Sequence, residues 1–249
     1  MVERNGKMNH PRSLPPKVAL SAFAIPAAFA SFLFATPAIA QDPAAQEKLH
    51  AIQKAQAADK QKLAQYTWQE TEAISIKGQD KDSRVYQVRI GPDGQQQKTE
   101  IVEDAEVSDP RHQGRLEKHL AKDKSQEYKE YGQQISALAK QYTTPNPDLL
   151  TKAAQQGKVS IQSSNGIANL VIKDYLKPGD SVTMMIDDQT HSPVSVQIKS
   201  YLSDQKDAVN ISAEFGKLPD GLSHVVNATI QGVSKQLTIN DQNANYKKL

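Results

Sequence analysis

Cysteine is absent from the 249 residues of this chain, so no disulfide stabilises the folded protein. Zinc sites built from cysteine pairs are excluded for the same reason. Aromatic residues are scarce as well: they make up 6% of the chain, and Trp68 is its single tryptophan. Burial of aliphatic side chains and backbone hydrogen bonding must therefore supply most of the stability.

Long apolar runs are absent after residue 40, and the one such run lies near the N-terminus. The N-terminal segment is basic and ends at Lys17. An alanine-rich apolar stretch then covers residues 18–34, and Ala38-Ile39-Ala40 follows it. This order is typical of a secretory signal peptide over residues 1–40 that is cleaved after Ala40. A membrane anchor is the alternative, but the stretch is short for a bilayer and contains Pro26. We therefore expect a periplasmic protein with no stable membrane insertion after cleavage.

The chain has no large excess of either charge. Its formal net charge is +2, but Arg4, Lys7, Arg12 and Lys17 all belong to the predicted leader. Residues 41–249 are therefore close to neutral, which argues against nucleic acid as a partner, because such binding needs a clustered basic surface. Their length predicts a single domain.

The first part of this domain combines a helix with a hairpin. Residues 44–65 are rich in Ala, Gln, Lys and Glu and lack both Gly and Pro, which predicts a helix. Residues 66–77 alternate between apolar and polar side chains, the pattern of a half-buried strand. The same alternation over 84–90 precedes the turn sequence Gly91-Pro92-Asp93-Gly94, so residues 95–102 are expected to return as the hairpin partner.

A helical insertion is predicted over about 109–157, followed by a series of strands. Asp109 and Pro110 suit the start of a long helix, as N-cap and first helical residue. Residues 158–249 contain several alternating segments separated by short turns, which predicts an antiparallel meander with one apolar face. The expected inner face of the long helix consists of Leu116, Leu120, Tyr128, Tyr131, Ile135, Leu138 and Tyr142.

These elements predict a two-layer α+β domain in which helices cover one face of an antiparallel sheet. Two segments then carry a resemblance: Tyr66-Thr67-Trp68 after the leading helix, and the late hairpin from Met184 to Val194. With the order of elements, they resemble the exported half-barrel carriers, namely the outer-membrane lipoprotein-sorting family and the amino-terminal domain of periplasmic envelope-stress regulators. The resemblance implies a strongly curved, half-barrel-like sheet around an apolar cavity.

A binding protein rather than an enzyme is what this resemblance implies. The cavity would hold an acyl chain or a lipoprotein by burial of apolar surface, without a cofactor. An envelope structural or interaction protein, with an interior filled by its own side chains, is the alternative. Of the adjacent Met184 and Met185, one must face away from the core. The residues expected to line the cavity are Tyr66, Trp68, Ile74, Tyr86, Val88, Met184, Val196, Ile198 and Phe215.

Signatures of catalysis and of metal binding are weak throughout the chain. Glu70 and Glu72 lie about 7 Å apart along one strand, a separation that suits an inverting glycosidase, but we favour solvent exposure for both. His191 lies beside Ser192 and near Asp187, and a polar hairpin turn explains these residues better than a nucleophile and its base. The other histidines have no metal-ligand spacing. We therefore predict no metal site, and we regard a hydrolase as the least favoured function.

Overall fold

The computed structural model describes residues 43–101, 115–143 and 146–249. The predicted leader, its cleavage site after Ala40 and the expected helix start at Asp109 lie outside these residues. The described residues form three helices and ten strands in the order α1, β1–β3, α2, α3, β4–β10. Among these helices, none has the length and apolar character needed to cross a bilayer.

The N-terminal part folds as the sequence predicts, with one helix leading into a three-stranded segment. Helix α1 ends just before β1, and β2 begins earlier than expected, so the first hairpin is longer than its apolar alternation suggests. The turn at Gly91 joins β2 to β3, with the Gly94 N–H donating to the Gly91 carbonyl at 2.9 Å. The elements are α1 (Pro43–Leu63), β1 (Tyr66–Ile76), β2 (Gln79–Ile90) and β3 (Gln96–Ile101).

The helical insertion contains α2 (Arg115–Thr143) and α3 (Pro147–Gln155). Asn146 caps α3, because its side-chain oxygen accepts hydrogen bonds from the backbone N–H groups of Asp148 and Leu149 at 3.1 and 3.3 Å. Pro147 occupies the first helical position, where no backbone donor is needed. The expected inner face of α2 is confirmed where its side chains are described, since Tyr131, Ile135, Leu138 and Tyr142 are buried.

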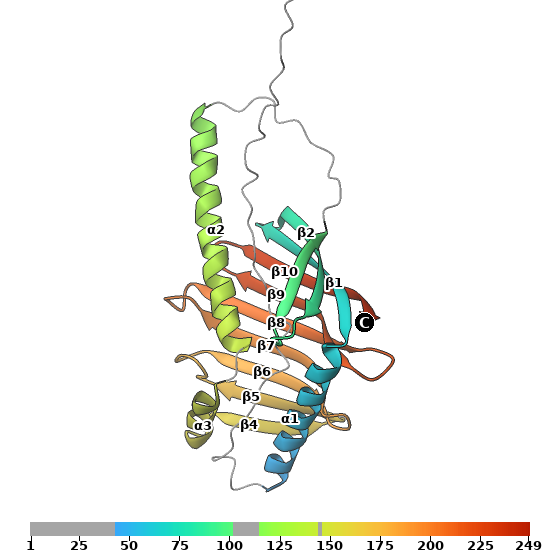
Figure 1. Cartoon of the computed structure of the whole chain (residues 1–249). Helices are drawn as coiled ribbons and strands as arrows, with labels where there is room; N and C mark the ends of the chain where they lie inside the picture. Colours follow the sequence, from blue (N-terminus) through green and yellow to red (C-terminus); the bar gives the residue numbers. More distant parts are fainter. Residues whose placement is uncertain (1–42, 102–114, 144–145) are drawn as a thin grey trace, which may run out of the picture.

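All ten strands belong to one antiparallel sheet. Its order is β3-β2-β1-β10-β9-β8-β7-β6-β5-β4. Strands adjacent in the sheet are therefore consecutive in sequence except β1 and β10, and the consecutive strands β3 and β4 form the two edges. The sheet curves around the helices, which lie on its concave side (Figure 1). This confirms the predicted α+β class. The later strands are β4 (Val159–Ser164), β5 (Ile167–Lys173), β6 (Ser181–Asp187), β7 (Pro193–Tyr201), β8 (Ala208–Lys217), β9 (Ser223–Gly232) and β10 (Leu237–Lys248).

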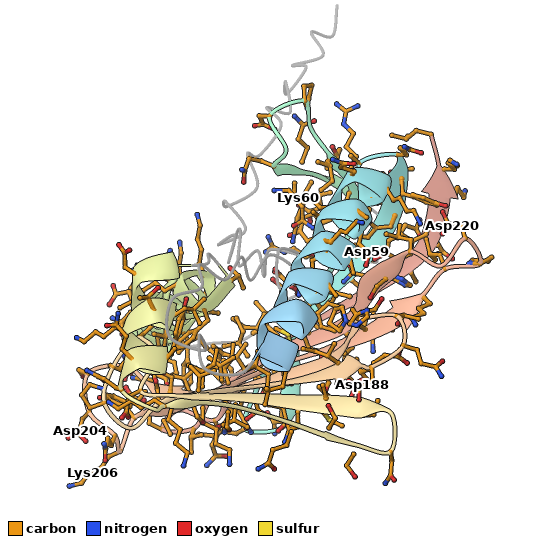
Figure 2. The ribbon with its side chains drawn as sticks, turned by 90° about the horizontal axis from the view of Figure 1, so that it is seen from below. Asp59, Lys60, Asp188, Asp204, Lys206 and Asp220 are labelled. Atoms are coloured by element: carbon orange, nitrogen blue, oxygen red, sulfur yellow. The ribbon has the colours of Figure 1, made fainter. Side chains whose placement is uncertain are left out.

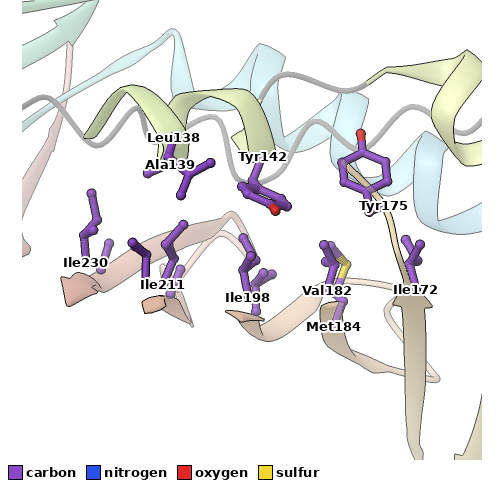
Figure 3. Packing of buried hydrophobic residues seen from close by; sticks show 14 of the residues in the cluster. Leu138, Ala139, Tyr142, Ile172, Tyr175, Val182, Met184, Ile198, Ile211 and Ile230 are labelled. Atoms are coloured by element: carbon purple, nitrogen blue, oxygen red, sulfur yellow. The ribbon is translucent and has the colours of Figure 1, made fainter. Parts of the chain in front are cut away.

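The concave face carries apolar rows that run across the strands. Helix α2 packs on these rows, and Figure 3 shows its Leu138 and Tyr142 above Ile198, Ile211 and Ile230 of the sheet. Each large aliphatic side chain buried there stabilises the fold by about 1.5–3 kcal/mol. One row consists of successive Cα partners from β4 to β1: Val159, Ile172, Val182, Ile198, Ile211, Ile230, Ile239 and Ile74.

Asp180 joins the end of α2 to the loop between β5 and β6. Its side chain is buried, and one carboxylate oxygen accepts a hydrogen bond from the Tyr142 hydroxyl at 2.5 Å. The same carboxylate accepts the backbone N–H groups of Tyr175, Leu176 and Lys177 at 2.6, 2.9 and 3.0 Å. One buried carboxylate thus accepts hydrogen bonds from four donors, one on α2 and three in the loop after β5. These bonds hold the end of α2 against the sheet.

Replacing Asp180 with Ala should lower the free energy of unfolding by about 3 kcal/mol or more, because several buried donors lose their acceptor. Asp204→Ala is the matched control: Asp204 lies in an exposed turn (Figure 2) and accepts one backbone N–H, from Lys206 at 2.9 Å. Its loss should cost less than about 1 kcal/mol. Urea unfolding followed by circular dichroism measures both values, and equal losses in the two variants would contradict the role assigned to Asp180.

Candidate functional site

The residues predicted to line a cavity lie on the inner face of the sheet or against its core. Trp68, Ile74, Val88, Met184, Val196 and Ile198 are fully buried, and Tyr66, Tyr86 and Phe215 are partly buried. Several of them belong to the continuous apolar core under the helices. Their role in ligand binding stays a prediction. Met185 is the methionine that faces away from the core, with 39% of its surface exposed.

Aromatic side chains gather where β1 meets β10. The indole N–H of Trp68 donates to the Asn243 side-chain oxygen at 2.9 Å. The Trp68 ring stacks on Tyr246 at a centroid distance of 5.5 Å, and the His224 ring meets Tyr246 edge-on at 4.3 Å. The Tyr246 hydroxyl donates to the Val225 carbonyl at 3.2 Å, so Trp68 and Tyr246 both have partners for their polar atoms, which is the usual arrangement for an enclosed Trp or Tyr.

Next to this stack lies a cluster of three buried carboxylates, Glu70, Glu72 and Asp241. Each offers an oxygen within 4.8 Å of the others. Glu72 is the Cα partner of Asp241 on β10, and Glu70 forms an ion pair with Lys98 of β3. The exposed fractions of Glu70 and Glu72 are 1% and 3%, so the predicted exposure of this pair was wrong. The physical reason is that β1 stays in the sheet along its length, so both side chains lie on the same buried face as Trp68 and Ile74. Lys98 of β3 and Asp241 of β10 lie against them there.

Burial changes the acid–base behaviour of this cluster. Desolvation raises the pKa of Glu72 to about 7, with Lys98 and Arg84 opposing the shift. The cluster can therefore hold a proton at neutral pH. Carboxylates are also ligands for hard divalent cations, but the ammonium of Lys98 already supplies positive charge there, and we assign no metal. The burial of both glutamates argues against access by a sugar, which the glycosidase hypothesis requires.

A groove of about 750 Å³ lies between α1 and the end of β2, at the rim of the sheet. The last turns of α1, the β2–β3 turn and the final residue Leu249 form its walls. Ile90, in this groove, continues along β2 the alternation that points Tyr86 and Val88 inward. The lining residues are Ala57, Lys60, Gln61, Ala64, Arg89, Ile90, Gly91, Pro92, Gly94 and Leu249.

The sequence did not point to this groove. Its walls come from three segments far apart in the chain. The helix, the inward Ile90 and the turn at Gly91-Pro92 are each predicted from local patterns, but no local pattern brings them together. Figure 2 shows Lys60 on α1 next to Asp59, whose pKa burial raises, with a backbone hydrogen bond from Ser223 opposing the shift. Lys60 and Arg89 are the charged side chains in the groove wall, and both are cationic.

The His191 turn is a hairpin turn, as expected. The Asp187 carboxylate accepts the backbone N–H groups of Gln189 and Thr190 at 3.1 and 2.7 Å, which is the usual role of an aspartate in a turn. His191 has a left-handed backbone, with φ of 57°. In the described part of the chain, no hydrogen bond links its imidazole to Asp187 or Ser192.

Comparison with known proteins gives matches of structure and none of sequence. No family model and no curated protein matches the chain. Similar solved structures include the following two. A LolA superfamily protein from Nitrosomonas europaea has 11% identity and a TM-score of 0.36, covering 82% of this chain and 93% of its own. A DUF1329 family protein from Desulfovibrio piger has 8% identity and a TM-score of 0.37, covering 80% and 92%. Neither match supports an inference about function.

The raised pKa of Glu72 predicts a stability that depends on pH. The folded protein keeps a proton that the unfolded chain releases between pH 4.5, the ordinary pKa, and about 7. Stability therefore falls as the pH rises through this window, by up to about 3 kcal/mol from this group. Glu72→Gln should remove that part of the slope, because its amide stays neutral at every pH.

Thermal unfolding at pH 5 and pH 8 measures this effect. At each pH we compare the melting temperature of Glu72→Gln with that of the unmodified protein. This difference, variant minus unmodified, should be several degrees larger at pH 8 than at pH 5. Glu214→Gln on the exposed face of β8 is the matched control and should show no such gain. If this difference in melting temperature rises equally in both variants between pH 5 and pH 8, or rises in neither, Glu72 is not protonated in the folded protein.

Proposed function

We propose that the protein is an exported carrier that binds the apolar chain of a lipid, or of a lipoprotein, at the rim of its inner face. The observation that carries this proposal is the groove between α1, the β2–β3 turn and Leu249. Its volume of about 750 Å³ is in the range of sites that enclose small ligands. The function proposed is reversible binding, and no catalytic step is assigned.

The groove wall suits an acyl chain. Ala57, Ala64, Ile90, Pro92 and Leu249 present aliphatic surface to it. Each methylene that such a wall removes from water contributes about 0.8 kcal/mol to binding. The two cations of the wall belong to the ends of long side chains, which can stay in water while their stems line the groove.

The groove also adjoins two of the residues that the sequence predicts to bind ligand, Val88 and Trp68. Val88 lies two residues before Ile90 on the same face of β2, and Trp68 is the Cα partner of Val88 on β1. A ligand in the groove therefore lies at the edge of the apolar surface that these residues form. Met184 and Val196 lie under the helices, farther along the sheet.

A second candidate function is a structural or interaction protein of the envelope with a filled interior. The packed rows favour it, because Met184, Val196 and Ile198 are fully buried among protein atoms. The two candidates differ in one measurable property. A carrier binds a free apolar ligand in the groove, whereas a filled structural protein binds none.

Ala57→Trp tests the carrier directly, because the indole would occupy the groove. Binding of a fluorescent polyene fatty acid should become at least tenfold weaker in this variant. Ala137→Trp is the matched control, since Ala137 is also an exposed helical alanine and lies on α2, away from the groove. Its affinity should equal that of the unmodified protein.

Two outcomes would contradict the proposal. Absence of saturable fatty-acid binding in the unmodified protein would favour the structural alternative. Equal binding by the unmodified protein and by Ala57→Trp would exclude the groove as the binding site. Circular dichroism of each variant establishes that the fold is retained.

A further inference from the structure

The convex face of the sheet has two adjoining grooves, on the side opposite the helices. The first has a volume of about 480 Å³ and crosses β4 to β7. The second, of about 280 Å³, crosses β7 to β9. Gln197 lines both, so the two grooves meet at this side chain and together cross six strands. We call the pair the channel. At about 4.8 Å between strands, the channel is about 24 Å long.

Strand register arranges the side chains of this channel in rows that cross the strands. Gln162, Asn169, Met185 and Ser195 are successive Cα partners from β4 to β7. A second row runs from β6 to β9 through Thr183, Gln197, Ser212 and Thr229. Apart from Met185, every side chain of these two rows carries an amide or a hydroxyl group, and the rows repeat at the spacing of the strands.

The chemistry of the channel is neutral and rich in hydrogen-bonding groups. Of the side chains that line the two grooves, Lys199 alone carries a charge. Amides and hydroxyls both donate and accept hydrogen bonds, as do the hydroxyls and acetamides of a sugar. The side-chain amides of Asn169 and Gln197 form no hydrogen bond within the described part of the protein, so they are available to a ligand. Met185 and Ile167 add apolar surface for methyl and C–H groups.

Other ligands fit this channel less well. An extended peptide that adds to a sheet needs free backbone donors and acceptors, but β5, β6, β7 and β8 are paired on both sides. An anionic ligand needs more than the single cation of Lys199. We propose that the convex face binds a neutral glycan chain that bears acetamide groups, such as a chain of N-acetylhexosamines. This site is independent of the lipid groove on the other side of the sheet.

A nuclear magnetic resonance titration with chitohexaose, a neutral oligomer of N-acetylglucosamine, tests this proposal. The side-chain amide signals of Asn169 and Gln197 should shift in a saturable way, with the dissociation constant given by the titration. Gln197→Ala should weaken the affinity at least fivefold, since Gln197 lines both grooves. Gln242→Ala is the matched control, because Gln242 is also exposed but lines neither groove, and its affinity should be unchanged.

Three results would overturn the proposal. The first is no signal shift at millimolar chitohexaose. The second is a set of shifts confined to the concave side or to the α1 groove. The third is equal affinity of Gln197→Ala and the unmodified protein. Because Gln197 is exposed and points away from the core, its replacement is expected to leave the fold intact, and the spectrum of the variant verifies this.

Discussion

The pairing of β1 with β10 joins the β1–β3 segment and the β4–β10 meander into one sheet. It is the one place in the sheet where neighbouring strands come from opposite ends of the domain. Without it, the β1–β3 segment and the β4–β10 meander would each expose an additional edge, with unpaired backbone groups. With it, the apolar row continues from Ile239 to Ile74, and one concave face extends over all ten strands.

The same pairing determines where the polar groups of the inner face meet. It places Glu72 opposite Asp241 and Glu70 opposite Asn243, and Lys98 approaches from the other side of β1. Helix α2 packs over Ile198, Ile211 and Ile230 (Figure 3), whereas the carboxylates and the Trp68–Tyr246 stack lie where β1 meets β10. The α1 groove is linked to that region through β2, because its Ile90 lies two residues from Val88, the Cα partner of Trp68. On the convex face, by contrast, the described strands present mainly uncharged polar groups.

Local patterns were sufficient to predict the elements, but not their long-range contacts. Alternation of apolar and polar residues predicted β1 and the meander, and the spacing of Tyr131, Ile135, Leu138 and Tyr142 predicted the buried side of α2. The burial of Glu70 and Glu72 was not predicted because it depends on contacts with β10. The alternation of apolar and polar residues in β1 does not indicate which strand lies beside it. The α1 groove was missed for the same reason, since Ala57, Ile90 and Leu249 meet only after the sheet has formed.

The proposed site places an apolar chain at the rim of the sheet and not within its core. Intermolecular nuclear Overhauser effects between a bound fatty acid and the methyl groups of the protein can locate that chain. This placement predicts contacts from the acyl chain to Ile90, Ala64 and Leu249, and none to Ile198 or Ile211. Contacts to Met184, Ile198 and Ile211 without contacts to Ile90 would contradict it, because they would place the ligand inside the core that the helices fill.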